Sequence, residues 1–184
     1  GHTVALDAVC SGLSLMSTIK KKKKGANITG LINPNKRSDA YTEVTKYMNK
    51  LLKEDGIDSF TVSRKDAKSA VMSYLYGSQA VPEKVFGKAL LPYFYKAMEY
   101  KAKGAMELLG LLRGSWDKHA LVHQWTLPDG YLAYVPTIET VEKRVNIVEL
   151  NYSPVVNIQV NQPKDAGVAN IANVVHSIDA YVLR

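Results

Sequence analysis

The chain has 184 residues, 46% of them hydrophobic, so it is long and apolar enough to fold around one sizeable core. Its 24 Lys and Arg residues against 17 Asp and Glu give a net charge of +7, which suits a polyanionic partner without identifying one. The single cysteine, Cys10, excludes a disulfide framework and four-cysteine zinc sites, and no segment is apolar enough to predict a membrane partner.

The N-terminus and the histidines do not indicate a catalytic or metal-binding site. Gly1-His2, with no initiator Met, has the form of a cleavage scar, so His2 is set aside. His119 and His123 have a weak metal-ligand spacing, but they lead into a strand-like stretch and favour a structural role. The absence of a signal peptide, together with the single cysteine, predicts a reducing, cytoplasmic setting.

The N-terminal stretch combines a short strand, a helix and a basic run. Residues Thr3 to Asp7 predict a buried strand that ends in a carboxylate, and a turn leads to a helix over Leu13 to Ile19. A lone Asp at a strand end is most often a cap or turn residue. Lys20 to Lys24 are five consecutive lysines. They indicate a solvated, mobile loop or, alternatively, a salt-sensitive contact with nucleic-acid phosphates.

Two amphipathic helices follow. Asp39 is expected to cap a helix over Ala40 to Lys53, and Ser63 a second helix that starts at Arg64 and ends near Gly77. The buried stripe of the first helix is Tyr41, Val44, Tyr47, Met48, Leu51 and Leu52. In the second helix four residues spaced four apart form one row on the surface: Arg64, Lys68, Met72 and Tyr76. Such a row is often only a solvated face with scattered cations.

In the second half of the sequence, the residue pattern predicts helices, then strands and then a final helix. Residues 77–87 are expected to be a linker, followed by helices over 92–104 and 105–113 whose Met, Tyr and Leu residues pack in the core rather than bind a ligand. The Pro-Asp-Gly turn at 128–130 predicts a hairpin over 123–135. A strand over 140–152 should continue the same sheet, followed by a strand over 155–160, a turn over 161–165 and a helix over 169–184. The fold class is therefore α+β, mainly helical, with a small antiparallel sheet or hairpin.

Three stretches resemble one family in the right order. The pattern Arg64-x-x-x-Lys68-x-x-Val71-Met72-x-x-x-Tyr76-Gly77-Ser78 is similar to the nucleotide-binding helix of single-subunit DNA-directed RNA polymerases, the bacteriophage and mitochondrial type. The run Val4-Ala5-Leu6-Asp7-Ala8-Val9-Cys10-Ser11-Gly12 resembles the first palm motif of these enzymes. The segment His176-Ser177-x-Asp179-Ala180 resembles a third signature, in which the His lies near the nucleotide sugar or the RNA 3′ end.

The resemblance implies roles for single residues. Asp7 would be the first of two carboxylates that hold two Mg²⁺ ions, with the backbone carbonyl of Ala8 as a further ligand, and hard oxygen ligands suit this ion. Arg64 would grip the outer phosphates, and Lys68 would neutralise and protonate the leaving pyrophosphate. Gly77 would belong to the same nucleotide-binding site, and Asp179 would anchor neighbouring groups.

The resemblance also implies sugar selection for ribonucleotides by three residues. Gly12 stands where related DNA polymerases have a glutamate that blocks the ribose 2′-hydroxyl, so this glycine argues against a DNA-polymerase fragment. Tyr76 and His176 would read the sugar. Such steric and hydrogen-bonding discrimination can depend on one residue.

The expected molecule is a fragment of a longer polymerase. Residues 1–24 would form an edge strand of the palm, a turn and the start of a helix. Residues 25–184 would form the fingers, with the nucleotide-binding helix at 64–77 and the C-terminal helix at 169–184. The sequence lacks the His-Asp pair that carries the second metal-binding carboxylate of the family, so we expect no polymerisation by these residues alone.

The expected partners are a DNA template, nascent RNA, ribonucleoside triphosphates and the rest of the polymerase. The location would be a host cytoplasm for a phage protein, or a mitochondrion. The alternative function is a non-catalytic basic domain that binds nucleic acid through Lys20 to Lys24. The two functions differ in geometry, because the polymerase requires Asp7, the Arg64–Tyr76 face and His176 to converge on one cleft.

Overall fold

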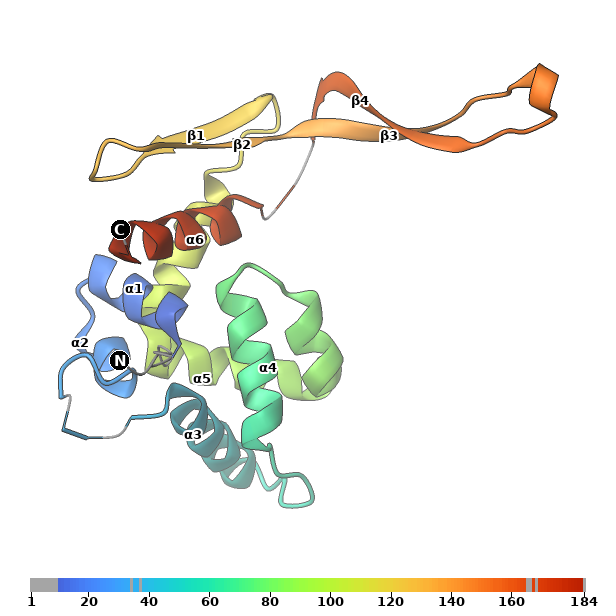
Figure 1. Ribbon diagram of the computed structural model, residues 1–184. Coiled ribbons are helices and arrows are strands. Elements are labelled where there is room, and N and C mark those ends of the chain that lie inside the picture. The colour runs from blue at the N-terminus through green and yellow to red at the C-terminus, as the bar shows by residue number, and fades with distance from the viewer. Residues whose placement is uncertain (1–9, 34, 37, 165–166, 168, 184) are drawn as a thin grey trace, which may run out of the picture.

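The computed structural model describes residues 10–33, 35–36, 38–164, 167 and 169–183. These residues form a helical body and two β-hairpins, of which the first lies along the C-terminal helix and the second extends away from the body (Figure 1). The α+β fold class is confirmed. The predicted strand Thr3–Asp7 lies outside the described residues. In chain order the elements are α1 (Ser11–Ile19), α2 (Lys23–Ile28), α3 (Ala40–Glu54), α4 (Arg64–Leu75), α5 (Ala80–Gly114), β1 (Val122–Thr126), β2 (Leu132–Pro136), β3 (Ile138–Arg144), the 3-10 helix η1 (Val148–Leu150), β4 (Val155–Pro163) and α6 (Ala169–Leu183).

The hydrophobic core lies where α5 packs against α1, α3, α4 and α6 (Figure 1). Phe94 of α5 is fully buried and meets the ring of Tyr74 edge-on, with 5.7 Å between ring centroids. Because aromatic side chains bury large apolar areas, this pair contributes strongly to the attachment of α4. Further fully buried side chains come from α1, α3, α4, α5 and α6: Leu13, Met16, Val44, Met48, Leu52, Val71, Leu75, Met98, Leu109 and Ile171.

The starts of α3 and α4 are where the sequence predicts them. The Asp39 carboxylate accepts hydrogen bonds from the backbone N–H groups of Tyr41 and Thr42, and the Ser63 hydroxyl accepts one from Asp66. Such caps satisfy N–H groups that have no partner within the helix, and each contributes about 1 kcal/mol. The two caps therefore fix where each helix begins.

The linker predicted over 77–87 is wrong, because α5 begins at Ala80. Pro82 lies in the first turn of this helix, where the missing N–H costs nothing. The backbone leaves helical geometry at Gly87 (φ 66°, ψ 170°) and Ala102 (φ −130°, ψ 36°) and not at the predicted boundary between 104 and 105. Leu111, predicted to be in the core, is 61% exposed.

The predicted hairpin around Pro128-Asp129-Gly130 is present, with β1 antiparallel to β2. The prediction that the next strand continues this sheet is wrong, because β3 and β4 form a separate antiparallel pair. That strand ends at Arg144, and residues 161–163, predicted as a turn, belong to β4. The β3–β4 hairpin extends away from the body (Figure 1), so its apolar residues, such as Val141 and Ile158, are largely exposed.

The lysine run is partly helical, since α2 begins at Lys23, within the expected loop. Lys21 has a left-handed backbone (φ 51°), and its N–H donates to the carbonyl of Thr18. The N–H of Lys22 donates to the carbonyl of Ser17 at 2.9 Å. These bonds tie the run to the end of α1. Within the described ranges, no helix is both long and apolar enough to cross a bilayer.

Candidate functional site

The row of four residues on α4 lies at the surface as the spacing predicts. Arg64 and Lys68 are exposed at the N-terminal end, Met72 is 41% exposed, and Tyr76 is half-buried at the C-terminal end. At 1.5 Å per residue the row is about 18 Å long. Its cationic end coincides with the helix end at which backbone N–H groups and the helix dipole favour anions. The opposite face of α4 is buried through Ala67, Ala70, Val71 and Leu75.

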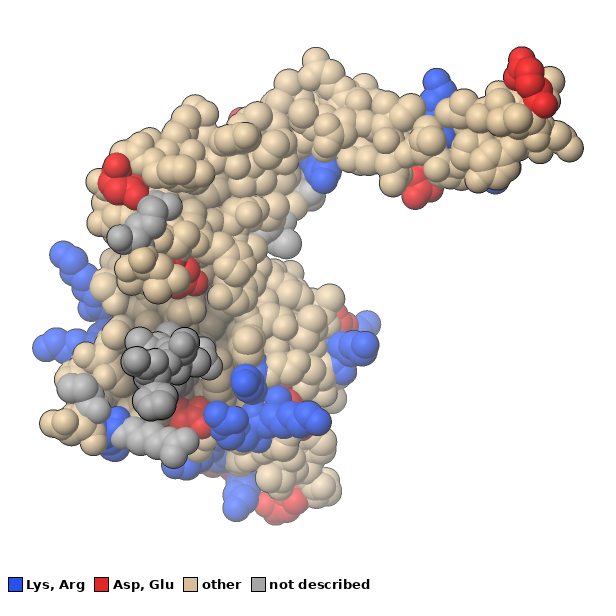
Figure 2. Space-filling view, in the orientation of Figure 1, with Lys and Arg blue, Asp and Glu red and all other residues tan. Residues whose placement is uncertain are grey.

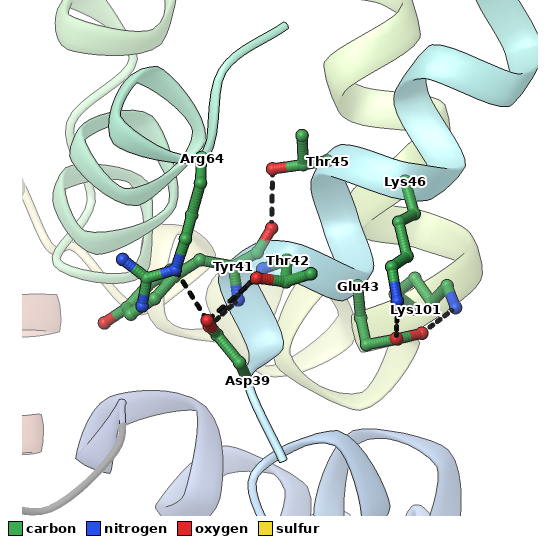
Figure 3. A network of polar contacts seen from close by, with 8 residues as sticks. All are labelled: Asp39, Tyr41, Thr42, Glu43, Thr45, Lys46, Arg64 and Lys101. Carbon is green, nitrogen blue, oxygen red and sulfur yellow. Dashed lines mark hydrogen bonds and ion pairs between the residues drawn. The ribbon is translucent and has the colours of Figure 1, made fainter. Parts of the chain in front are cut away.

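Arg64 is held by an acidic residue that the sequence indicated only as a helix cap (Figure 3). Its Nε donates to Oδ2 of Asp39 at 2.6 Å. The same oxygen accepts from the Thr42 hydroxyl at 2.8 Å. The guanidinium carbon of Arg64 lies 5.6 Å from the centre of the Tyr41 ring, and Nζ of Lys68 lies 6.0 Å from it. Both cations of the row therefore lie over one aromatic ring of α3.

The Asp39–Arg64 pair keeps both groups charged near neutral pH. Burial raises the pKa of Asp39, but the hydrogen bonds from Arg64 and Thr42 and the charge of Arg64 outweigh it, and the net pKa is lowered. The hydrogen bond and charge of Asp39 raise the pKa of Arg64. A ligand with phosphates would have to compete with this carboxylate for the guanidinium.

The first motif reaches the same place through Cys10, a buried residue whose thiol interacts with the Tyr41 side chain. Burial is the main reason that the pKa of Cys10 is raised, and burial also raises the pKa of Tyr41. Asp7 and Ala8 lie outside the described residues. Among the described residues, no three His, Cys, Asp or Glu side chains are placed to hold a metal, so the Mg²⁺ site remains a prediction.

The three sugar-selecting residues predicted from the resemblance come together at the other end of α4. The rings of Tyr76 and His176 are stacked, with centroids 4.9 Å apart and planes 16° apart. Gly12 is buried beside them, and a Cβ at this position would lie 3.8 Å from Val175 and 3.9 Å from Leu75. Residues from α1, α4 and α6, far apart in sequence, therefore share one junction.

The neighbours of this junction hold it in place. Asp179, predicted as an anchor, accepts a hydrogen bond from the Ser11 hydroxyl at 3.5 Å, which ties α6 to α1. Gly77 has φ +97°, a backbone conformation that favours glycine, and its N–H donates to Tyr74 at 2.9 Å. The side chain of Arg113 donates to the carbonyl of Gly77 at 3.5 Å. Gly77 thus orients the end of the row through its backbone.

The lysine run contacts α5 rather than the α4 row. Lys20 and Lys22 form ion pairs with Glu107 at 3.6 and 3.7 Å, and Nζ of Lys24 lies 3.2 Å from the centre of the Tyr100 ring. Lys and Arg side chains gather over the lower part of the helical body and at its left edge, near α1 and α2, whereas the projecting hairpin carries few (Figure 2).

Sequence reasoning missed Asp39 and Tyr41 as neighbours of the cationic pair. Asp39 carries a clear cap signal, and Tyr41 fits the apolar stripe of α3, so both already had an explanation. A cap residue and the residue two positions after it lie at the same end of a helix. This spacing could have indicated that Asp39 and Tyr41 share one set of neighbours. Because the starts of α3 and α4 lie close together, their first turns are in contact.

The described parts of the three signatures therefore meet along α4. The family model described as DNA-dependent RNA polymerase matches residues 2–89. The match covers slightly less than half of the chain, and it agrees with the resemblance of the first two motifs to single-subunit RNA polymerases. None of the curated proteins matches the chain. The matched segment includes the first motif and all of α4, while His176 lies beyond it.

Proposed function

We propose that this chain supplies the nucleotide-binding face of a DNA-directed RNA polymerase, for which the substrates are ribonucleoside triphosphates and the partners are a DNA template, nascent RNA and the remainder of the enzyme. The observation that carries the proposal is the stacking of Tyr76 on His176 beside Gly12. The family match includes two of these residues but not His176. The contact between the third signature and the other two is therefore an observation that does not depend on the family match.

In this proposal the α4 row binds the triphosphate along its length. The planar fork of Arg64 suits the outer phosphates, and Lys68 neutralises the charge that develops on the leaving pyrophosphate and can donate a proton to it. Tyr76 packs against the base, and together with His176 it contacts the ribose, while Gly12 leaves the 2′-hydroxyl unblocked. These residues act mainly by positioning and charge neutralisation.

Asp7 and the Ala8 carbonyl are the groups expected to hold Mg²⁺, because oxygen ligands of this kind suit it. When bound, Mg²⁺ would supply charge stabilisation for the attack of the RNA 3′-hydroxyl on the α-phosphorus. The sequence contains no His-Asp pair for a second carboxylate of the expected kind. We therefore propose that these 184 residues do not synthesise RNA without further protein.

The proposal is tested by calorimetric titration of the chain with ATP. The double variant Arg64→Gln/Lys68→Gln should bind ATP at least about tenfold more weakly, because charge-assisted hydrogen bonds to phosphate are lost. Lys65→Gln is the matched control, since Lys65 is exposed on the same helix but outside the row. Equal affinity of the double variant and the wild type, or equal weakening by Lys65→Gln, would contradict the proposal.

Sugar selection and inactivity are tested separately. The wild-type chain should prefer ATP over dATP, and His176→Ala should reduce this preference without abolishing binding. Extension of a primed RNA on a DNA template, measured with radiolabelled nucleotides, should be absent for the 184 residues alone. Template-dependent RNA synthesis by the isolated chain would overturn the second proposal, and Asp7→Ala would show whether that synthesis depends on the expected carboxylate.

A further inference from the structure

A second basic surface lies between the lysine run and α5. Lys21 to Lys24 form one side of an open groove of about 810 Å³, and Lys96 and Lys103 of α5 lie on the other side. Glu99 is the one acidic residue in the lining. Six lysines against one glutamate leave a strong positive charge. Among the described residues, Lys21, Lys23 and Lys103 have no carboxylate within ion-pair distance.

Close packing holds these lysines in place. The Cα of Gly104 in α5 lies so close to the run that an added Cβ would be 2.7 Å from Cγ of Lys22 and 3.2 Å from Cβ of Lys20. Lys20 and Lys22 also bind Glu107 from the same side. A lysine run of this kind is ordinarily mobile and solvated. Here the glycine and the glutamate fix its backbone against α5, so the charges are presented in a fixed arrangement.

The groove has an aromatic wall as well as a cationic rim. Tyr100 is 47% exposed and stacks one face on Tyr47, with centroids 4.2 Å apart and planes 7° apart. Nζ of Lys24 lies 3.2 Å from the centre of the Tyr100 ring. Tyr95 and Met106 complete the apolar part of the lining. The Lys24 ammonium thus covers a ring face that a flat ligand could use, and it is held there by a cation–π interaction.

We infer that this groove binds a short stretch of single-stranded nucleic acid, separate from the nucleotide site on α4. Proteins that bind single strands without sequence preference combine a positively charged groove with aromatic rings on which bases stack. A base that stacks on Tyr100 displaces Lys24, which then contacts a neighbouring phosphate. The choice of nucleic acid as the polyanion rests on the polymerase family and on the exposed ring. The groove itself is independent of the α4 row.

The inference is tested by fluorescence anisotropy with a fluorescein-labelled 15-nucleotide oligo(dT) titrated with the whole chain over a series of NaCl concentrations. The triple variant Lys21→Gln/Lys23→Gln/Lys103→Gln should bind at least about tenfold more weakly at low salt. The slope of log affinity against log salt should fall by about 2, since each phosphate contact on a single strand contributes about 0.7. Lys53→Gln/Lys84→Gln/Lys88→Gln removes the same charge from exposed positions elsewhere and should retain most of the affinity.

Further variants test the aromatic wall and separate the two sites. Tyr100→Phe should bind oligo(dT) like the wild type, and Tyr100→Leu about tenfold more weakly, because stacking on an aromatic ring contributes 1–3 kcal/mol per base, and 1.4 kcal/mol is tenfold. The groove triple should retain ATP affinity, and Arg64→Gln/Lys68→Gln should retain oligo(dT) affinity. No binding by the wild type, equal weakening by the control triple, or equal affinity for a duplex of the same length would overturn the inference.

Discussion

The helical body and the projecting β3–β4 hairpin differ in what determines their structure. In the body, apolar side chains at helical spacing meet partners on other helices, and Phe94, Met98 and Leu109 are fully buried. In the hairpin, β3 and β4 contact mainly each other, and Val148 and Leu150 near its tip are 75% and 69% exposed. Apolar side chains therefore stabilise the body by burial, whereas the hairpin depends mainly on backbone pairing between its two strands.

The largest expected effect is in the centre of the body. Phe94→Ala should lower the free energy of unfolding by about 3–5 kcal/mol, because it removes a fully buried ring that contacts Tyr74 and Phe86. Ile158→Ala in the hairpin, where the side chain is 39% exposed, should cost less than about 1 kcal/mol. Urea unfolding measures both. Similar costs for the two variants would remove the distinction between the regions.

The next effect concerns the contact between the lysine run and α5. Gly104→Ala should cost about 1–3 kcal/mol, because the new methyl group overlaps Lys22 and Lys20 near their backbones. Gly110→Ala is the matched control in the same helix, since no atom lies within 4 Å of its added Cβ. Removing this glycine should stabilise the chain by about 0.5–1 kcal/mol. Thermal unfolding of the two variants should shift in opposite directions, and a shift in the same direction would show that Gly104 is not close-packed.

A smaller effect is expected from acid. Glu43 binds Lys101 at 2.8 Å and Lys46 at 3.6 Å (Figure 3), and the hydrogen bond from Lys101 is the main reason that the pKa of Glu43 is lowered. The pKa of Asp39 is also lowered. A carboxylate with a lowered folded pKa stabilises the fold above its unfolded pKa of about 4, and this contribution is lost as pH falls through the folded pKa.

The stability of the body should therefore decrease below about pH 4, and Glu43→Gln should reduce that decrease. Urea midpoints measured from pH 7 to pH 3 provide the test. Because these groups lie near the surface, each contribution should be within about 1 kcal/mol. A Glu43→Gln chain with the same loss of stability in acid as the wild type would show that this carboxylate is not responsible.

The smallest expected effect is a change in affinity with little change in stability. Asp39→Asn should retain the cap of α3, since Asn and Asp cap helices equally well, but it removes the charge that competes for Arg64. ATP should then bind a few-fold more tightly, as measured by calorimetry, while the thermal midpoint stays close to that of the wild type. Weaker ATP binding by this variant would mean that Asp39 positions Arg64 for the phosphates instead of competing with them.

The sequence was sufficient where a local signal and a burial pattern agree. Asp39 and Ser63 mark the starts of α3 and α4, and the apolar stripe of α3 is buried almost as predicted. The meeting of Gly12, Tyr76 and His176 was predicted only through the family resemblance, because spacing along one helix cannot reveal which distant residue stacks on Tyr76. The nucleotide-binding roles assigned to these residues remain predictions.

The remaining errors have physical causes. Gly87 and Pro82 look like linker residues, but a proline is tolerated in a first helical turn and a glycine permits a local break within a longer helix. The separate β3–β4 sheet could not be predicted, because alternating apolar and polar residues indicate a strand but do not show which strand it pairs with. The fixed conformation of the lysine run depends on its contact with Gly104, about eighty residues away. No local pattern in the sequence therefore predicts it.

Cys10 gives the molecule an internal reporter. It is the only thiol in the chain, it lies three positions after Asp7, and it is buried against Tyr41 beneath the cationic end of α4. The thiolate is the form that attacks an alkylating reagent, so burial and a raised pKa both slow the modification of Cys10. The rate of alkylation therefore records how often this part of the protein opens, and it does so without the introduction of a foreign label.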